Sequence, residues 1–275
     1  MKKFLGLFLT LIVCSSLFGQ TTIWTHDFET SGGYTTSITE FTDNSTDYFI
    51  RTNGSDIGSE SFSNQQGTWY FAAQDIDGEG ASLPVTMTFD DIAIGSHTSL
   101  VFSIFLAEDD DGTKQDWDEP DYVHIMYDID NSGSFTDLLF IENDGSTYNS
   151  APFIDTDFDG TGDGTEITNA FTEFIANVAG TGSVIDIKIE FNLDSGDEDI
   201  AIDNLKIVGN AGTPSNQPPA ITAITQTPET VDESATVSVS AEVTDADGTV
   251  TGVELRWGTT SGDRKSTRLN SSHYS

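Results

Sequence analysis

The sequence predicts an all-β fold, an antiparallel jelly-roll sandwich, and three observations support this prediction. Between residues 23 and 208 the apolar residues occur in short runs that alternate with polar residues. Each run has the length of a strand and is flanked by Gly, Asp, Asn or Ser, which favour turns. Helical segments do not separate the runs, so an antiparallel sandwich is favoured over a parallel sheet.

The predicted strands can be placed from the alternation alone. They are centred on residues 70–72, 85–89, 100–106, 122–127, 135–141 and 185–191. One further stretch, residues 171–178, fits both helical and strand spacing. We expect a strand there, because an antiparallel neighbour at 185–191 follows across the turn at 180–182.

Size and charge restrict the functions that the chain can have. It has 275 residues, with 18 Phe, 4 Trp and 7 Tyr, which is enough apolar material for one good core and part of another. The 46 acidic and 10 basic side chains give a formal charge of −36. Such a charge repels phosphate backbones, so we expect no direct nucleic-acid binding. An acidic surface of this density also attracts cations.

The first 20 residues resemble a secretory signal peptide. Lys2 and Lys3 precede an apolar run from Phe4 to Phe18, and the small residue Gly19 follows. Lipid attachment at Cys14 is the alternative, but Val13 is larger than the residue expected there. We therefore expect a secreted or cell-surface bacterial protein, exported by the general secretory pathway, with no membrane span after the signal is removed.

Composition divides the rest of the chain into segments. A jelly-roll domain at 21–208 is followed by a Gly/Pro/Ser/Asn-rich linker at 209–219. Residues 220–262 resemble the first half of a bacterial immunoglobulin-like β-sandwich, so the second domain is expected to be partial. Residues 263–275, which include DRKSTRLNSSH, resemble a translated sequencing adapter, and we expect them to be disordered.

The clearest chemical motif is an acidic loop at residues 155–166, DTDFDGTGDGTE. It satisfies D-x-[DN]-x-[DN]-G-x5-E, and calcium is the hard cation that prefers such a set of carboxylates on a curled backbone. The loop resembles those of thrombospondin type 3 repeats and extracellular bacterial modules, without the apolar residue at position 8 of helical sensors. An acidic turn without an ion is the alternative. The predicted Ca²⁺ ligands are Asp155, Asp157, Asp159, Asp163 and Glu166.

Three weaker acidic clusters stand beside this motif. Asp75, Asp77 and Glu79 place three carboxylates at one bend, which is either a metal site or an acidic turn. Residues 128–133 begin like a calcium loop but fit a plain hairpin turn better. Residues 108–121 contain eight acids, whose repulsion a shared cation would relieve.

The first and last strands of the domain carry a resemblance to secreted jelly-roll modules. The opening WTHDFE at 24–29 and the closing GDEDIAIDNLKI at 196–207 resemble those of MAM-like and carbohydrate-binding modules. In such modules the two strands pair, and an acid from each holds a structural calcium ion. The resemblance implies Glu29 and Asp203 here. More closely, the domain resembles the N-terminal module of secreted flavobacterial-type multidomain proteins.

The residues present favour binding over catalysis. The histidines at 26, 97 and 124 are scattered, and no nucleophile or paired-carboxylate motif accompanies them, so the sequence leaves enzymatic activity undecided. We expect a monomeric, calcium-stabilised binding or adhesion module whose partner is polysaccharide or cell-surface glycan. Candidate aromatic residues for stacking on sugars are Trp69, Trp117 and Tyr122. The alternative is an accessory region of a secreted nuclease or phosphoesterase whose catalytic domain lies elsewhere.

Overall fold

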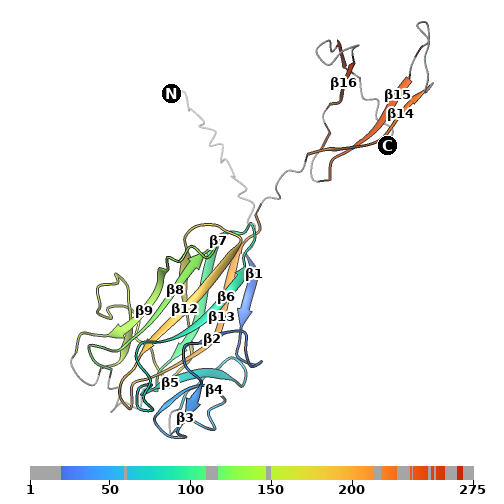
Figure 1. Cartoon of the computed structure of the whole chain (residues 1–275). Helices are drawn as coiled ribbons and strands as arrows, with labels where there is room; N and C mark the ends of the chain where they lie inside the picture. The colour runs from blue at the N-terminus through green and yellow to red at the C-terminus, as the bar shows by residue number, and fades with distance from the viewer. Residues whose placement is uncertain are drawn as a thin grey trace, which may run out of the picture. The chain divides into compact units, whose positions relative to one another are not determined.

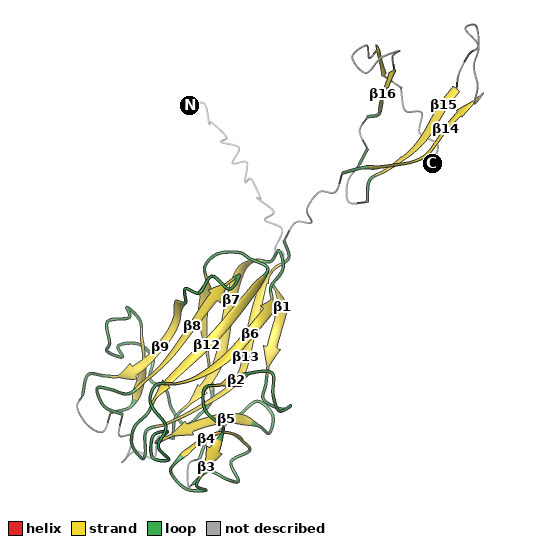
Figure 2. Ribbon diagram, viewed as in Figure 1, coloured by secondary structure: helices red, strands yellow, loops and turns green. Residues whose placement is uncertain are grey.

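The computed structural model describes residues 20–58, 61–109, 117–146, 150–212, 218–227, 236, 238–246, 249–250, 252–257 and 265–268. The described chain consists of strands and loops, with no helix in those ranges (Figure 2). It divides into two compact units, one ending at Gly212 and the other beginning at Thr213. The signal-peptide prediction falls on residues outside the described ranges, apart from Gln20.

The first unit is a sandwich of two antiparallel sheets, as predicted (Figure 1). The seven-stranded sheet has the order β11 (Thr172–Val178), β7 (Thr98–Ala107), β13 (Asp199–Asn210), β5 (Tyr70–Gln74), β4 (Tyr48–Thr52) and β3 (Phe41–Thr42), with β1 (Thr21–His26) also paired to β13. The six-stranded sheet has the order β10 (Pro152–Asp155), β9 (Thr136–Asn143), β8 (Tyr122–Ile129), β12 (Val184–Asn192), β6 (Val85–Ala93) and β2 (Thr35–Thr36). The ambiguous stretch is a strand from Thr172 to Val178, as expected. Its expected antiparallel neighbour was wrong, because β11 pairs with β7, whereas β12 lies in the other sheet between β8 and β6.

The core lies between the two sheets and follows the alternation read from the sequence. Along β12 the odd-numbered residues from 185 to 191 are buried and the even-numbered ones face outward. Apolar residues from both sheets fill the interior, among them Met87, Phe102, Ile125, Ile189 and Ile207. Burial of this apolar area is the main force that holds the sheets together.

Strand β13 sets the positions of the acidic groups at one end of the sandwich. Its C-terminal part pairs with β1 from Leu205 to Gly209, and its N-terminal part pairs with β5 from Asp199 to Ile202. Asp203 lies where the partner changes. This junction brings the end of β1 and the segment before β5 close to the middle of β13.

The second unit contains two strand pairs in the part that the structure describes. β14 (Ala220–Thr227) pairs with β15 (Ser238–Thr244), and β16 (Glu254–Trp257) pairs with β17 (Lys265–Arg268). The sequence predicts no regular structure for residues 263–275, so β17 corrects that prediction for residues 265–268. Backbone pairing requires no particular side chains, and the unpaired edge of β16 accepts any extended segment. The immunoglobulin-like assignment stays a prediction.

The predicted linker at 209–219 overlaps the end of β13, which runs to Asn210, so we expect limited proteolysis to cleave between residues 211 and 219 and to leave the first unit intact. The first unit has its own core, whereas strand pairs of the second leave Ile221, Ile224 and Val239 exposed by 61%, 68% and 41%. Isolated strand pairs of this kind are marginally stable. Mass spectrometry of the fragments over time checks this expectation. Equal protease resistance of the two units would contradict it.

Candidate functional site

The acidic loop predicted from the sequence begins at the end of β10 and is curled by its first residue. The Asp155 carboxylate accepts hydrogen bonds from the backbone N–H groups of Asp157 at 3.1 Å, Phe158 at 2.7 Å and Gly160 at 3.0 Å. Gly160 has a φ of +93°, a conformation that side chains other than glycine rarely adopt. The short turn that results brings the next acidic side chains back over Asp155.

Three carboxylates of this loop come together as a calcium site requires. One oxygen from each of Asp155, Asp157 and Asp159 lies within 4.8 Å of the others. Oxygens that bind one Ca²⁺ at about 2.3–2.6 Å are separated by up to about 5 Å, so the spacing fits a shared ion. Asp155 is buried and the other two are exposed. A bound ion would therefore be held on its buried side by Asp155 and would remain open to water on the side of Asp157 and Asp159.

A fourth carboxylate faces the loop from the neighbouring strand. Glu142, near the end of β9, is paired with Phe153 of β10 and is 8% exposed. Its Oε2 atom is buried and makes no hydrogen bond to the described residues. Burial and the nearby charges of Asp155 and Asp159 raise the pKa of Glu142 to about 7. A buried carboxylate without a donor is costly unless a cation or proton neutralises it, so this arrangement fits Ca²⁺.

The two remaining predicted ligands have other positions. The Asp163 carboxylate accepts hydrogen bonds from the Thr156 backbone N–H at 2.9 Å and from the Thr156 hydroxyl at 2.7 Å, so it braces the loop. Glu166 forms a backbone bridge with Phe153. Neither carboxylate belongs to the described group whose oxygens all lie within 4.8 Å of one another.

Glu142 could not be found from the motif, because it lies on a different strand. One sequence signal points toward it: the apolar run at 138–141 ends in this acid. An acid that continues a buried strand needs a partner, but the sequence alone does not show that β10 and its loop supply one.

The pair implied by the resemblance, Glu29 and Asp203, is brought together at the junction in β13. The Glu29 carboxylate accepts from the backbone N–H groups of Thr68 and Trp69, and Asp203 accepts from that of Gln66 at 2.9 Å. Gly67 allows this close approach, because a Cβ atom there would overlap the Glu29 carboxylate. The pairing of β1 with β13 expected from the resemblance is thus observed. The calcium assignment stays a prediction.

The environment of the Asp203 carboxyl differs from that of Glu29. Burial, outweighing the N–H groups of Gln66 and Asn204, raises the pKa of Asp203 to about 7, and the charges of Glu29 and Asp27 act in the same direction. The two donated N–H groups lower the pKa of Glu29. At neutral pH Glu29 is therefore ionised and Asp203 is partly ionised, so the pair carries more than one negative charge. A cation would stabilise this charge.

In the third predicted cluster, Asp75, Asp77 and Glu79, the acids do not all have the neighbours expected from the sequence. Burial and the charges of Asp47 and Asp77 raise the pKa of Asp75 to about 6, so the close neighbours of Asp75 include a residue from before β4. Glu79 instead lines an open pocket of about 290 Å³ with Ile38, Thr39, Phe41, Gly80 and Ala81. The metal assignment of Asp75, Asp77 and Glu79 stays a prediction.

The weak candidate at 128–133 is a turn. The Asp128 carboxylate accepts hydrogen bonds from the Ser132 hydroxyl and from the backbone N–H groups of Ser132 and Gly133. These bonds lower the pKa of Asp128 and close the hairpin between β8 and β9. Of the eight acids at 108–121, five lie in the described residues, namely Glu108, Asp109, Asp118, Glu119 and Asp121, and the shared cation stays a prediction.

Of the three aromatic residues predicted to stack on sugars, Trp117 does not fit. It is fully buried in the core, and its indole N–H donates to the backbone oxygen of Asp199 at 3.3 Å. The prediction for Trp117 is therefore wrong, because the segment before β8 turns this ring inward to close the end of the sandwich. Trp69 is half-buried, and the guanidinium of Arg51 lies 3.9 Å from its ring centroid.

Tyr122 lies on the outer face of the six-stranded sheet beside two other aromatic side chains. The Tyr122 and Phe140 rings meet edge to face at 5.5 Å, and His124 stacks on Phe140 at 4.3 Å. Cross-strand pairing places Glu190 beside His124 and Asn192 beside Tyr122. We call Tyr122, His124, Phe140, Glu190 and Asn192 the outer-sheet patch.

No family model and no curated protein matches the chain. Among solved structures, it is similar to the CBM22-1 xylan-binding domain of Xyn10C from Paenibacillus barcinonensis, with 11% identity and a TM-score of 0.39, over 70% of this chain and 97% of that chain. It is also similar to the K3 cleaved adhesin domain of Lys-gingipain from Porphyromonas gingivalis W83, with 13% identity and a TM-score of 0.37, over 69% and 99% of the two chains.

A further similar structure is the C-terminal family 22 carbohydrate binding module of Clostridium thermocellum Xyn10B, with 8% identity and a TM-score of 0.36, over 70% of this chain and 96% of that chain. At these identities and TM-scores the likeness carries no argument about function. In the described part of the chain, no helix is long and apolar enough to cross a membrane.

Proposed function

We propose that the first unit is a non-catalytic, calcium-stabilised binding module of a secreted or cell-surface protein, and that its outer-sheet patch binds a neutral polysaccharide. The carrying observation is the aromatic group of Tyr122, His124 and Phe140 on an open sheet face. Aromatic rings supply apolar contact to the faces of sugar rings, while neighbouring polar side chains form hydrogen bonds to hydroxyl groups. The formal charge of −36 argues against an anionic glycan.

The polar groups needed for such binding flank the aromatic side chains. Glu190 and Lys188 form an ion pair at 2.9 Å, and Asn192 is the cross-strand neighbour of Tyr122. The His124 Nε2 atom lies 2.9 Å from the Asp137 carboxylate. Donors and acceptors therefore border the rings on two sides, a pattern that suits a ligand rich in hydroxyl groups.

His26, His97 and His124 each have structural contacts within the first unit. His26 Nε2 lies 2.9 Å from the backbone oxygen of Gly32, and His97 Nδ1 lies 2.7 Å from that of Ile94. His124 stacks on Phe140 beside Asp137. Each ring thus packs or hydrogen-bonds within the sandwich.

The calcium loop adjoins this patch. Glu142, which faces Asp155 and Asp159, is the cross-strand partner of Tyr122 in the β8–β9 pairing. An ion that neutralises Glu142 would hold the ends of β8, β9 and β10 in place. We therefore expect calcium to preserve the geometry of the aromatic patch as well as the stability of the unit.

Replacing Tyr122 or Phe140 with Ala is expected to weaken polysaccharide binding about tenfold or more, because a central aromatic contact typically contributes at least about 1–2 kcal/mol. Affinity electrophoresis and calorimetry with a panel of neutral polysaccharides measure the change. Ile175→Ala is the matched control, because Ile175 is 62% exposed on β11 of the other sheet. Absence of binding across the panel, or full affinity in Tyr122→Ala, would contradict the proposal.

A further inference from the structure

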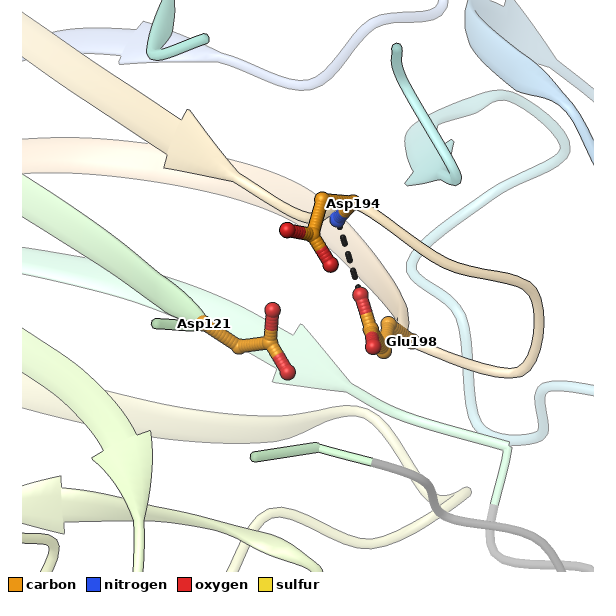
Figure 3. Close-up of side chains that lie close together, drawn as sticks. All are labelled: Asp121, Asp194 and Glu198. Atoms are coloured by element: carbon orange, nitrogen blue, oxygen red, sulfur yellow. Dashed lines mark hydrogen bonds between the residues drawn. The ribbon is translucent and has the colours of Figure 1, made fainter. Parts of the chain in front are cut away.

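A second cluster of carboxylates lies at the start of β8, the end of the strand away from the β8–β9 turn. Asp121 directly precedes β8, while Asp194 and Glu198 belong to the loop between β12 and β13 (Figure 3). Strands β8 and β12 belong to the six-stranded sheet and β13 to the seven-stranded sheet. The three acids therefore meet where the chain passes from one sheet to the other.

Two of these carboxylates are held in fixed orientations by backbone groups. Glu198 Oε2 accepts from the backbone N–H groups of Asp194 at 2.8 Å and Ser195 at 2.7 Å. Asp121 Oδ2 accepts from that of Asp118 at 2.6 Å. Each side chain thus has one oxygen bound to its own turn, and the carboxyl groups of Asp121 and Glu198 lie within hydrogen-bonding range of each other.

The remaining oxygen of Asp121, Oδ1, is the atom that indicates a ligand at this site. Asp121 and Glu198 are each 2% exposed. Asp121 Oδ1 is buried and has no hydrogen-bond partner among the described residues. The charged neighbours of Asp121 are further carboxylates, those of Asp118 and Asp194. Two buried carboxylates in contact need either a shared proton or a cation between them.

The third carboxylate favours the cation. One oxygen from each of Asp121, Asp194 and Glu198 lies within 4.8 Å of the others, the spacing of oxygens around one Ca²⁺. A shared proton needs only two carboxyl groups and leaves Asp194 unexplained. Asp77 and Asp118 add their negative charge close to Asp194. The site therefore attracts a cation at a point where the buried pair lacks one.

We propose that Asp121, Asp194 and Glu198 bind one Ca²⁺ at a site separate from the Asp155 loop. The ligand atoms are all oxygens, which suits a hard cation, and the exposed Asp194 side leaves room for water ligands. The ion ties the start of β8 to the loop that joins the two sheets. It thereby closes one end of the sandwich next to the buried Trp117.

Calcium binding by the full chain, measured by equilibrium dialysis and calorimetry, tests the site. Asp194→Asn is expected to lose one ion per chain, or to bind it at least tenfold more weakly. Asp157→Asn affects the other site, and the double variant loses both ions. Asp90→Asn is the matched control, because Asp90 is an exposed acid of β6 outside these groups. Equal ion number and affinity in wild type and Asp194→Asn would overturn the proposal, as would binding of Mg²⁺ but not Ca²⁺.

A second variant separates the ion from a shared proton. In Asp121→Asn the amide oxygen keeps the bond from Asp118, and the amide N–H donates toward Glu198. This variant is expected to melt above wild type in EGTA and to lose that advantage in calcium. A stabilisation of the same size in both conditions would assign the contact to a shared proton and overturn the calcium site.

Discussion

Chelation of calcium with EGTA is expected to lower the melting temperature of the first unit by roughly 5–10 °C for each ion lost. At free calcium a hundredfold above the dissociation constant, one bound ion adds about 2.7 kcal/mol to the free energy of unfolding. For a unit of this size, 1 kcal/mol corresponds to about 2–4 °C. The physical reason is the mutual repulsion of the carboxylates of Asp155, Asp157, Asp159 and Glu142, which a bound cation relieves.

A single substitution in the loop is expected to change stability with opposite signs in the two conditions. The charges of Asp159, Asp163 and Asp155 together with desolvation raise the pKa of Asp157, so its charge is unfavourable without an ion. Asp157→Asn therefore destabilises the protein in calcium and slightly stabilises it in EGTA. Thermal melts of this variant and of Asp90→Asn measure the difference. A melting temperature that EGTA leaves unchanged would show that the loop is an acidic turn without an ion.

The strands of the sandwich could be predicted because one side of each sheet faces the core. In β12, for example, Ile185, Ile187, Ile189 and Phe191 alternate with polar residues, and a shift of one residue would expose all four. The alternation left 171–178 undecided, and the neighbour expected for it at 185–191 lies in the other sheet. Trp117 had no such pattern around it. A single aromatic residue in an acidic segment gives no sign that its ring closes the end of the core.

The acidic sites show where local sequence stops being informative. Asp155 and Asp157 are close because two residues of one loop must be close, so a motif was sufficient. Glu142 joins them through strand pairing, and Asp121 meets Glu198 although 77 positions separate them in the sequence. Such groups depend on which strands become neighbours, and the spacing of acids in the chain does not encode that. The proximity of Glu29 and Asp203 could be predicted only because the resemblance implied that the first and last strands pair.

In EGTA, the free energy of unfolding is expected to fall as the pH rises from about 4.5 to about 7. Burial and the charges of Asp155 and Asp159 raise the pKa of folded Glu142 to about 7 from an ordinary value of 4.5. The folded protein thus holds this proton more tightly than the unfolded chain does. The stabilisation is complete below about pH 4.5 and is lost as the pH passes through about 7, with an upper limit on the order of 3 kcal/mol. Asp203, whose pKa is also raised to about 7, contributes in the same direction.

Glu142→Gln is expected to flatten this dependence, because the amide stays neutral at every pH and needs no proton. The variant should therefore be more stable than wild type at pH 8 in EGTA. In saturating calcium the wild-type slope is expected to reverse, since the ion binds ionised carboxylates and protons compete with it. Urea unfolding at pH 5, 6, 7 and 8, with Asp90→Asn as the control that keeps the wild-type slope, measures each effect. Parallel curves for Glu142→Gln and wild type in EGTA would show that Glu142 is neutralised by something other than a proton or a calcium ion.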